Sequence, residues 1–189
     1  LRGGRGGAGD GFETVVEGNQ GANAEGAPGR ARLYEPADLA WYEEPMPAED
    51  LGGHIRLSAA TTLPVAVGES IYSLSHFREY LQRDACSIVQ ADVARIGGIT
   101  PWLKVAHLAE SFNVDICPHF LMELHVGLTA AVPNGRWVEY IPQLDSLTTE
   151  GMRIENGRAI PSDAPGLGIA WDFAAIDRQR VEGATRIVT

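Results

Sequence analysis

The chain has 189 residues, which is long enough for one domain with a hydrophobic core. Its apolar content of 44% and charged content of 21% are those of a globular protein, and it lacks a run of about 18 apolar residues that would span a membrane. The net charge of −10 argues against nucleic acid and anionic membranes as partners, so any anionic substrate needs a local cation.

The start of the chain, residues 1–11, is more than half glycine, and we expect it to be poorly ordered. It contains no apolar stretch of the kind found in signal peptides. Cys86 and Cys117 lack the spacing of a disulfide framework or a metal site, so a reducing, cytoplasmic location is expected. The absence of an initiator methionine indicates that the chain begins inside a longer one.

From residue 12 onward, an apolar run that ends in a polar group is followed by a helical stretch, and this pattern repeats. The six runs end at Glu17, Glu43, Glu69, Asp92, His119 and Glu139. Helices are predicted near 50–61, 75–83, 101–112 and 123–132 from the spacing of their apolar residues. Ser75 and Thr100 are predicted N-caps for two of these helices. The 20 to 27 residues between successive run ends match one strand–helix unit.

Buried strands that alternate with helices indicate a parallel sheet. The predicted fold class is α/β, namely the C-terminal part of a (β/α)8 TIM-type barrel with about six strand–helix units. Because all strand ends of a barrel reach one rim, the six polar groups would converge on one mouth. A doubly wound sheet is the alternative, but it would bring only a few of them together, and its G-x-G-x-x-G fingerprint is absent.

Two stretches have their own local signals. Gly26, Pro28 and Gly29 work against a helix after Glu17. Further along, the stretch "MRIENGRAIP" predicts a hairpin whose turn is the Asn-Gly pair at 156–157.

Six short motifs together resemble the enolase superfamily, mandelate racemase subgroup. They are "WYEEP", "VGES", "QADVARIGGIT", "CPHFLMELH", "RWVEY" and "PGLGI", in the order and spacing of that family over residues 12–171. The stretch "PHFLMELH" and the residues after it look most like acid-sugar dehydratases, such as those that act on talarate and galactarate.

The resemblance implies that three of the six groups are metal ligands: Glu17, Glu43 and Glu69. Carboxylate oxygens are the ligands that Mg2+ prefers, so Mg2+ is the expected cofactor. The usual residue at the first position is Asp, and the longer side chain of Glu17 puts the strict geometry of Mg2+ in question. Glu44 follows Glu43 directly, so it is expected to point away from the metal as a rim or supporting residue.

The remaining groups are implied to move protons and to hold the substrate. His119 is the expected base or acid, and Asp92 would accept its other ring N–H and fix the tautomer. Glu139 would hydrogen-bond the substrate carboxylate or its enediolate. Arg95 is interpreted as a substrate contact or a structural salt bridge, and His125 as a residue that faces the mouth.

The implied activity is Mg2+-dependent abstraction of the proton alpha to a carboxylate through an enediolate. The hypothesis we favour is dehydration of an acid sugar, either an aldarate or an aldonate. Racemisation or epimerisation of a 2-hydroxy acid, a catalytically incomplete fragment, and a glycosidase are alternatives. The expected partner is a small anionic substrate, and we expect the full-length protein to be a homo-oligomer.

The family's capping domain and first two barrel strands, including a lysine motif that acts as the opposing base, would precede this chain. The expected organisation is therefore a glycine-rich start (1–11), a partial barrel (12–145) and a C-terminal segment (146–189). In the family, this last segment packs beside the capping domain.

Overall fold

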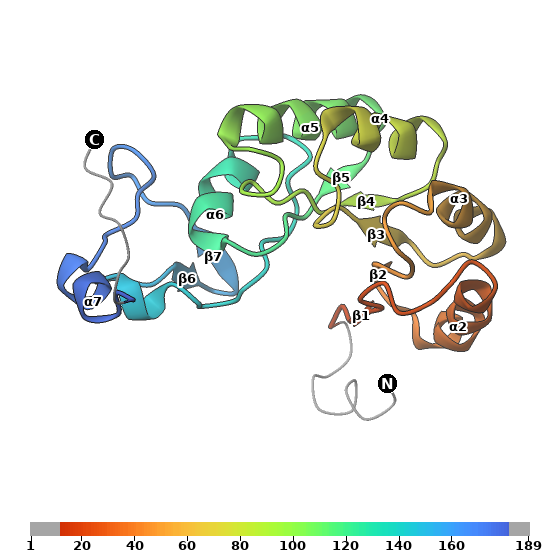
Figure 1. Ribbon diagram of the computed structural model, residues 1–189, viewed down its shortest axis with the longest axis horizontal. Helices are drawn as coiled ribbons and strands as arrows, with labels where there is room; N and C mark the ends of the chain where they lie inside the picture. The colour runs from red at the N-terminus through yellow and green to blue at the C-terminus, as the bar shows by residue number, and fades with distance from the viewer. Residues whose placement is uncertain (1–11, 182–189) are drawn as a thin grey trace.

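The computed structural model describes residues 12–181, and the glycine-rich start lies outside the described residues. Its central feature is a parallel sheet whose strands follow one another in chain order (Figure 1). They are β1 (Val15–Glu17), β2 (Trp41–Glu43), β3 (Val65–Val67), β4 (Ile88–Val89) and β5 (Asp115–Ile116). A doubly wound sheet reverses its strand order at a switch point. The unbroken order is that of a barrel wall.

Each of these five strands is followed by a helix. The helices are α2 (Gly26–Tyr34), α3 (Leu51–Ala60), α4 (Leu74–Gln82), α5 (Ile99–Ser111) and α6 (Met122–Ala130), and a short 3-10 helix, η1 (Glu35–Ala37), follows α2. Helices α2 to α5 cover the outer side of the curved sheet (Figure 1). The four predicted helices are confirmed to within two residues at each end. Among residues 12–181, none of the helices has the length and apolarity needed to cross a membrane.

The predicted N-caps were wrong by up to two residues. Ser73 caps α4, because its extended backbone lets its hydroxyl accept a hydrogen bond from the His76 backbone N–H. Ser75 lies inside the first turn of that helix. Helix α5 begins after Gly98, which has a φ of 116° and contributes no side-chain cap.

The expectation that glycine and proline prevent a helix after Glu17 was also wrong. Helix α2 starts at Gly26, so Pro28 lies in the first turn, where backbone N–H groups have no partner within the helix. The missing N–H of proline therefore costs no hydrogen bond. Asn23 supports this start, because its side chain and carbonyl accept from the N–H groups of Gly26 and Ala27.

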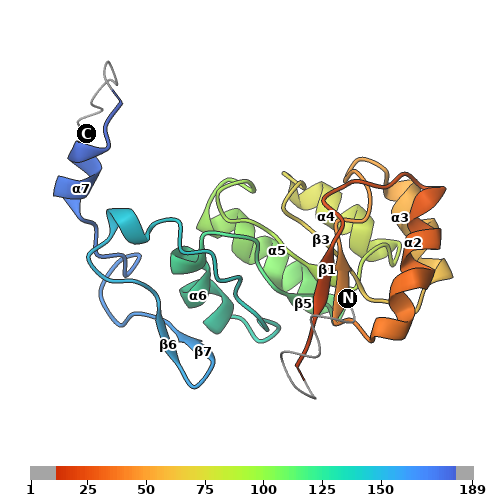
Figure 2. The same cartoon turned by 90° about the horizontal axis from the view of Figure 1, so that it is seen from below.

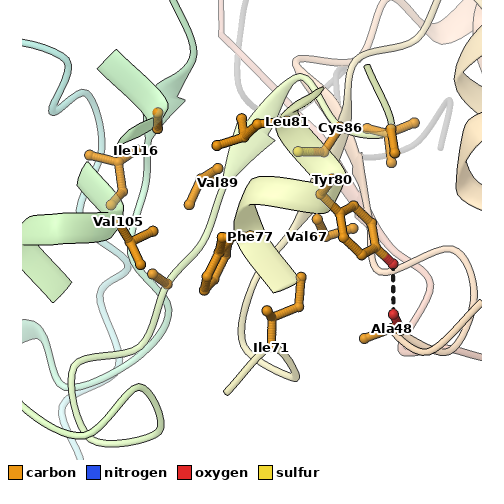
Figure 3. Close-up of a cluster of buried hydrophobic side chains, with 14 of the residues drawn as sticks. Ala48, Val67, Ile71, Phe77, Tyr80, Leu81, Cys86, Val89, Val105 and Ile116 are labelled. Atoms are coloured by element: carbon orange, nitrogen blue, oxygen red, sulfur yellow. Dashed lines mark hydrogen bonds between the residues drawn. The ribbon is translucent and has the colours of Figure 1, made fainter. Parts of the chain in front are cut away.

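The main core lies between the sheet and the outer helices (Figure 3). One continuous cluster of buried residues includes Val67 and Val89 from the sheet, Phe77 from α4 and Val105 from α5. Alternate strand residues point to the opposite, inner side, where Ala66 belongs to a second cluster with Ile88 and Cys117. The outer core anchors each strand, and the inner side is left for the polar strand ends.

The sixth predicted strand, around "RWVEY", does not form a regular strand. It meets the sheet through one parallel bridge between Ile116 and Gly135, and the Arg136 N–H donates to the Ile116 carbonyl at 3.2 Å. Within residues 12–181, no further strand pairs with this segment on the side away from β5. The segment nevertheless carries Glu139 to a cavity of about 580 Å3 on the inner side of the sheet.

The hairpin prediction is confirmed. β6 (Arg153–Glu155) and β7 (Arg158–Ile160) are antiparallel, and positive φ angles at Asn156 and Gly157 make the turn. The hairpin, the 3-10 helix η2 (Asp145–Leu147) and α7 (Phe173–Arg178) lie beyond α6, away from the sheet (Figure 2).

Candidate active site

Three carboxylates meet at the carboxyl ends of the first three strands. Glu17 and Glu43 are paired residues in neighbouring strands β1 and β2, and Glu69 follows β3 by two residues. Each offers one oxygen atom, and the three oxygens lie within 4.8 Å of one another. An all-oxygen group of this size fits a divalent cation such as Mg2+.

Local contacts orient these carboxylates. The Trp41 indole N–H donates to Glu43 Oε2 at 2.9 Å, and the Asn19 backbone N–H donates to Glu17. The contact between Trp41 and Glu43 was not predicted from the sequence, but it could have been found from the two-residue spacing, which places both side chains on the same side of one strand.

Glycine at position 68 brings the third carboxylate close to the next strand. A Cβ atom there would lie 2.4 Å from the backbone carbonyl carbon of Gln90, closer than real Cβ atoms approach. Only glycine allows the chain after β3 to pass so near β4. This passage places Glu69 between the other carboxylates and the residues that follow β4.

The three clustered carboxylates carry more negative charge than Arg95, which pairs with Glu69, can balance. Burial raises the pKa of Glu17 to about 7, against the lowering effect of the Asn19 hydrogen bond, and the negative charge of Glu43 adds to the rise. A nearby cation would stabilise the deprotonated form of a carboxyl group whose pKa is raised in this way.

Glu44 is separate from the three clustered carboxylates, but it is buried rather than placed on an exposed rim. It is 3% exposed, with a φ of 35°, and its Oε2 accepts a hydrogen bond from the Gln20 side chain at 3.0 Å. Burial raises its pKa, and the negative charge of Glu69 acts in the same direction. Glu44 therefore lies close enough to Glu69 for each carboxyl group to disfavour the charge of the other.

His119 lies between the carboxylate cluster and Asp92. Its Nδ1 is 2.9 Å from Asp92 Oδ2, and its Nε2 is 3.4 Å from Glu69 Oε2. The other carboxylate oxygen of Asp92 accepts from the backbone N–H groups of Ala94 and Arg95, at 2.7 and 3.3 Å. Asp92 is thus fixed by its own loop and in turn orients the His119 ring.

This pairing moves both pKa values toward the charged forms. Burial alone would lower the pKa of His119, but the hydrogen bond to Asp92 and the negative charges of Glu69 and Glu139 outweigh it and raise the pKa. Burial alone would raise the pKa of Asp92, but hydrogen bonds from His119 and the backbone lower it. His119 is therefore held in its protonated form more readily than a free imidazole.

Glu139 reaches the same region from the segment after β5. Its Oε2 accepts from the Phe120 backbone N–H at 2.6 Å, which ties it to the residue after His119. Glu139 and Glu43 both line the cavity on the inner side of the sheet, together with Gln90. The six groups that end the apolar runs are thus brought to one side of the molecule.

The side chain of Arg95 is already engaged within the protein. Its Nη1 donates to both the carbonyl oxygen and Oε1 of Glu69, each at 3.1 Å, and its Nε lies 3.8 Å from Asp92 Oδ2. Of the two interpretations from the sequence, these contacts favour the salt bridge. Arg95 links the carboxylate cluster to the Asp92–His119 pair.

The expectation that His125 faces the mouth and contacts substrate was wrong. Its side chain is fully buried, and both ring nitrogens contact backbone groups of Val93 and Phe120. It has no free nitrogen to offer a substrate. The periodicity of α6 does not reveal this, because the contact joins segments 32 residues apart.

The architecture and the site together define a class of protein: a (β/α) barrel with clustered carboxylates and an Asp–His pair at the strand ends. Residues 3–175 match the family model described as Enolase C-terminal domain-like, and the chain belongs to this family. The resemblance inferred from the motifs is thereby confirmed.

Named relatives agree with this placement. The L-talarate/galactarate dehydratase of Salmonella typhimurium is 39% identical over 160 residues, which are 85% of this chain and 40% of that protein. The 3,6-anhydro-alpha-L-galactonate cycloisomerase of Streptomyces coelicolor is 33% identical, over 92% of this chain and 48% of that protein. The chain thus spans less than half the length of these relatives.

A solved structure of the L-talarate dehydratase of Polaromonas sp. JS666, complexed with Mg and L-glucarate, matches the fold. The TM-score is 0.85 at 37% identity, and the match covers 90% of this chain and 48% of that chain.

Proposed function

We propose that the protein to which this chain belongs is a Mg2+-dependent hydro-lyase that dehydrates an acid sugar. The observation that carries the proposal is the contact between two kinds of group: His119 Nε2 lies 3.4 Å from Glu69 Oε2, so a proton-transfer residue adjoins a cation site. Relatives named as dehydratases of talarate, galactarate, gluconate and galactonate support the reaction class.

Glu17, Glu43 and Glu69 would hold Mg2+, and their close oxygens and the raised pKa of Glu17 fit that part. When bound, the cation would supply positive charge that stabilises the anion formed as the proton alpha to the substrate carboxylate passes to the opposing base, the lysine motif that the family resemblance places in the preceding part of the longer chain. The longer Glu17 side chain, in place of the usual Asp, still reaches the other two carboxylates.

His119 would transfer protons through Nε2, because Asp92 occupies its Nδ1. In a dehydration, a protonated His119 gives its proton to the departing β-hydroxyl group, and Asp92 stabilises the charged ring before that step. Glu139 would hydrogen-bond the substrate carboxylate, with its own position fixed by the Phe120 N–H. Arg95 would keep Glu69 and Asp92 in place.

We further propose that residues 12–145 form the barrel portion of the whole protein. The C-terminal segment, 146–189, would pack beside a capping domain supplied by the longer chain. In support, the described part of this segment, with the β6–β7 hairpin and α7, lies away from the sheet (Figure 2).

The test is turnover by the full-length parent protein on a panel of aldarates and aldonates, with Mg2+ or with EDTA. We expect release of water from at least one substrate with Mg2+, loss of turnover with EDTA, and loss of turnover in His119→Asn. Turnover that persists in EDTA, or an unaffected His119→Asn variant, would contradict the proposal. Exchange of the substrate α-proton with solvent deuterium, without net dehydration, would instead favour a racemase or epimerase.

A further inference from the structure

His125 connects two backbone segments from inside α6. Its Nε2 accepts a hydrogen bond from the Val93 backbone N–H at 3.0 Å, and its Nδ1 lies 2.6 Å from the Phe120 carbonyl oxygen. A ring nitrogen that accepts from an N–H carries no proton, and one that contacts a carbonyl oxygen must carry one. These contacts define a neutral ring with its proton on Nδ1.

The two connected segments carry the proton-transfer pair. Val93 directly follows Asp92, and Phe120 directly follows His119. One imidazole therefore joins the residues next to both members of a pair whose own contact is 2.9 Å. A shift of either segment would change that contact.

The segment after His119 needs such support. Phe120 and Leu121 have φ angles of 57° and 35°, which side-chain-bearing residues adopt only at a cost in free energy. Both backbone groups of Phe120 are held: its N–H donates to Glu139, and its carbonyl accepts from His125. The His125 side chain thus supplies one of the hydrogen bonds that hold this strained turn in place.

The segment around Asp92 is held in a similar way. The Trp102 indole N–H donates to the Ala91 carbonyl at 2.9 Å, and the Val93 N–H donates to His125. The Trp102 and His125 rings lie against each other, with centroids 6.0 Å apart. Asp92 therefore lies between two backbone groups that are fixed by one packed pair of side chains.

We propose that His125 is a positioning residue for the Asp92–His119 pair: its neutral ring hydrogen-bonds to both loops and sets the distance and orientation of the pair. Its part in catalysis rests on the proposed function, but the two hydrogen bonds are a property of the folded chain. Burial favours the neutral ring by lowering the His125 pKa, and the positive charge of protonated His119 acts in the same direction. The Phe120 carbonyl and the charge of Asp92 oppose this without reversing it.

The first test is nuclear magnetic resonance of the chain with 15N-labelled histidine at pH 7. We expect the His125 signals to show a protonated Nδ1 and an unprotonated Nε2. We also expect a His119 Nδ1–H signal that exchanges slowly with water, assigned by its absence in His119→Asn. A charged His125, or a proton on Nε2, would overturn the proposal even if no His125 variant folds.

The second test uses two variants that each keep one of the two hydrogen bonds made by the His125 ring. His125→Asn retains a donor near the Phe120 carbonyl, and His125→Gln retains an acceptor near the Val93 N–H. We expect the His119 Nδ1–H to exchange about fivefold faster or more in both, the change expected for loss of one net hydrogen bond. Unchanged exchange in folded variants would overturn the proposal.

His54 provides the matched control. It is also fully buried in a helix, and its Nδ1 contacts a carbonyl, that of Asp50, at 3.0 Å. His54→Asn should lower the melting temperature without changing His119 exchange, and equal acceleration there would reduce the His125 effect to general loosening and overturn the proposal. Because these readouts need no turnover, an inactive full-length parent would contradict the proposed function alone.

Discussion

Glu17 and Glu43 are register partners on the neighbouring parallel strands β1 and β2, so their carboxylates lie side by side at one end of the sheet. Two acidic groups in this arrangement repel each other unless a proton or a cation lies between them. In the proposed cation site this repulsion would lower the stability of the metal-free fold, and Mg2+ would relieve it, so both effects can be measured without a substrate.

Glu17→Gln should stabilise the metal-free chain at high pH. The pKa of Glu17 is about 7 in the fold and 4.5 for the free group, so the folded state binds more protons between these values. Stability from this group is therefore lost as pH rises through that window. Because the side chain is partly exposed and screened by solvent, we expect a gain of about 1 kcal/mol at pH 8.

The gain should shrink toward pH 4.5, where Glu17 of the natural chain is protonated in the fold. Urea unfolding in EDTA at both pH values measures the difference. Glu150→Gln, at an exposed position outside the cluster, is the control. A gain that is equal at the two pH values would rule out the protonation of Glu17 as its cause.

Mg2+ should bind the chain more tightly as pH rises through 7, because Glu17 must lose its proton to become a ligand. Saturating Mg2+ should raise the melting temperature at pH 8, since it binds only the folded state. We expect Glu43→Gln to weaken binding by about tenfold or more, as loss of one charged ligand does. Titration calorimetry at pH 6 and pH 8 measures the pH dependence of binding and the effect of Glu43→Gln, and thermal unfolding with and without Mg2+ measures the stabilisation. Binding that does not depend on pH would contradict the assignment of Glu17.

The carboxylate cluster can be predicted from the sequence because it follows from the order of the strands and helices along the chain. Once strands and helices alternate, the ends of successive parallel strands must meet at one edge, so Glu17, Glu43 and Glu69 are brought to one region, and the close passage at Gly68 then fixes the position of Glu69. The order of the strands in the sheet follows from the same repeat, and the structure confirms it.

Features that depend on single turns or on contacts between distant loops could not be predicted in this way. Pro28 is tolerated because α2 starts two residues before it, and a shift of that start by one turn would have made it disruptive. The burial of His125 depends on where the Val93 and Phe120 segments come to lie. Helical periodicity places a residue on one face of a helix but does not identify its partners.

Tyr80→Phe should destabilise the fold without affecting Mg2+ binding at the proposed site. The Tyr80 hydroxyl is buried, donates to the Ala48 carbonyl at 2.8 Å, and lies 3.1 Å from His54 Nδ1 (Figure 3 shows the Ala48 bond). Its removal leaves a buried carbonyl without this donor, which costs about 1–2 kcal/mol. Urea unfolding measures the loss, and Tyr72→Phe, at a side chain 62% exposed, is the control. A similar loss in both variants would contradict the assigned role of the buried bond.

Gly68→Ala should be severely destabilising because of the close passage between β3 and β4. The added methyl carbon would lie 2.4 to 2.6 Å from three backbone atoms of Gln90, and a backbone cannot rotate away as a side chain does. The strands must separate, and we expect a loss of about 3 kcal/mol or more, in the range of overpacked cores. Since Glu69 is the next residue, Mg2+ affinity should fall in any fraction that still folds.

Gly127→Ala is the matched control, because position 127 lies within α6 and a Cβ atom there would meet nothing within 4 Å. Alanine in a helix interior is favoured over glycine, so this variant should gain up to about 1 kcal/mol. Urea unfolding of the two variants side by side separates the close passage from the general effect of adding a methyl group. If Gly68→Ala unfolds at the same urea concentration as Gly127→Ala, the backbone after β3 can accommodate a side chain. In that case the requirement for glycine at position 68 is wrong, and glycine is not what places Glu69 in the cluster.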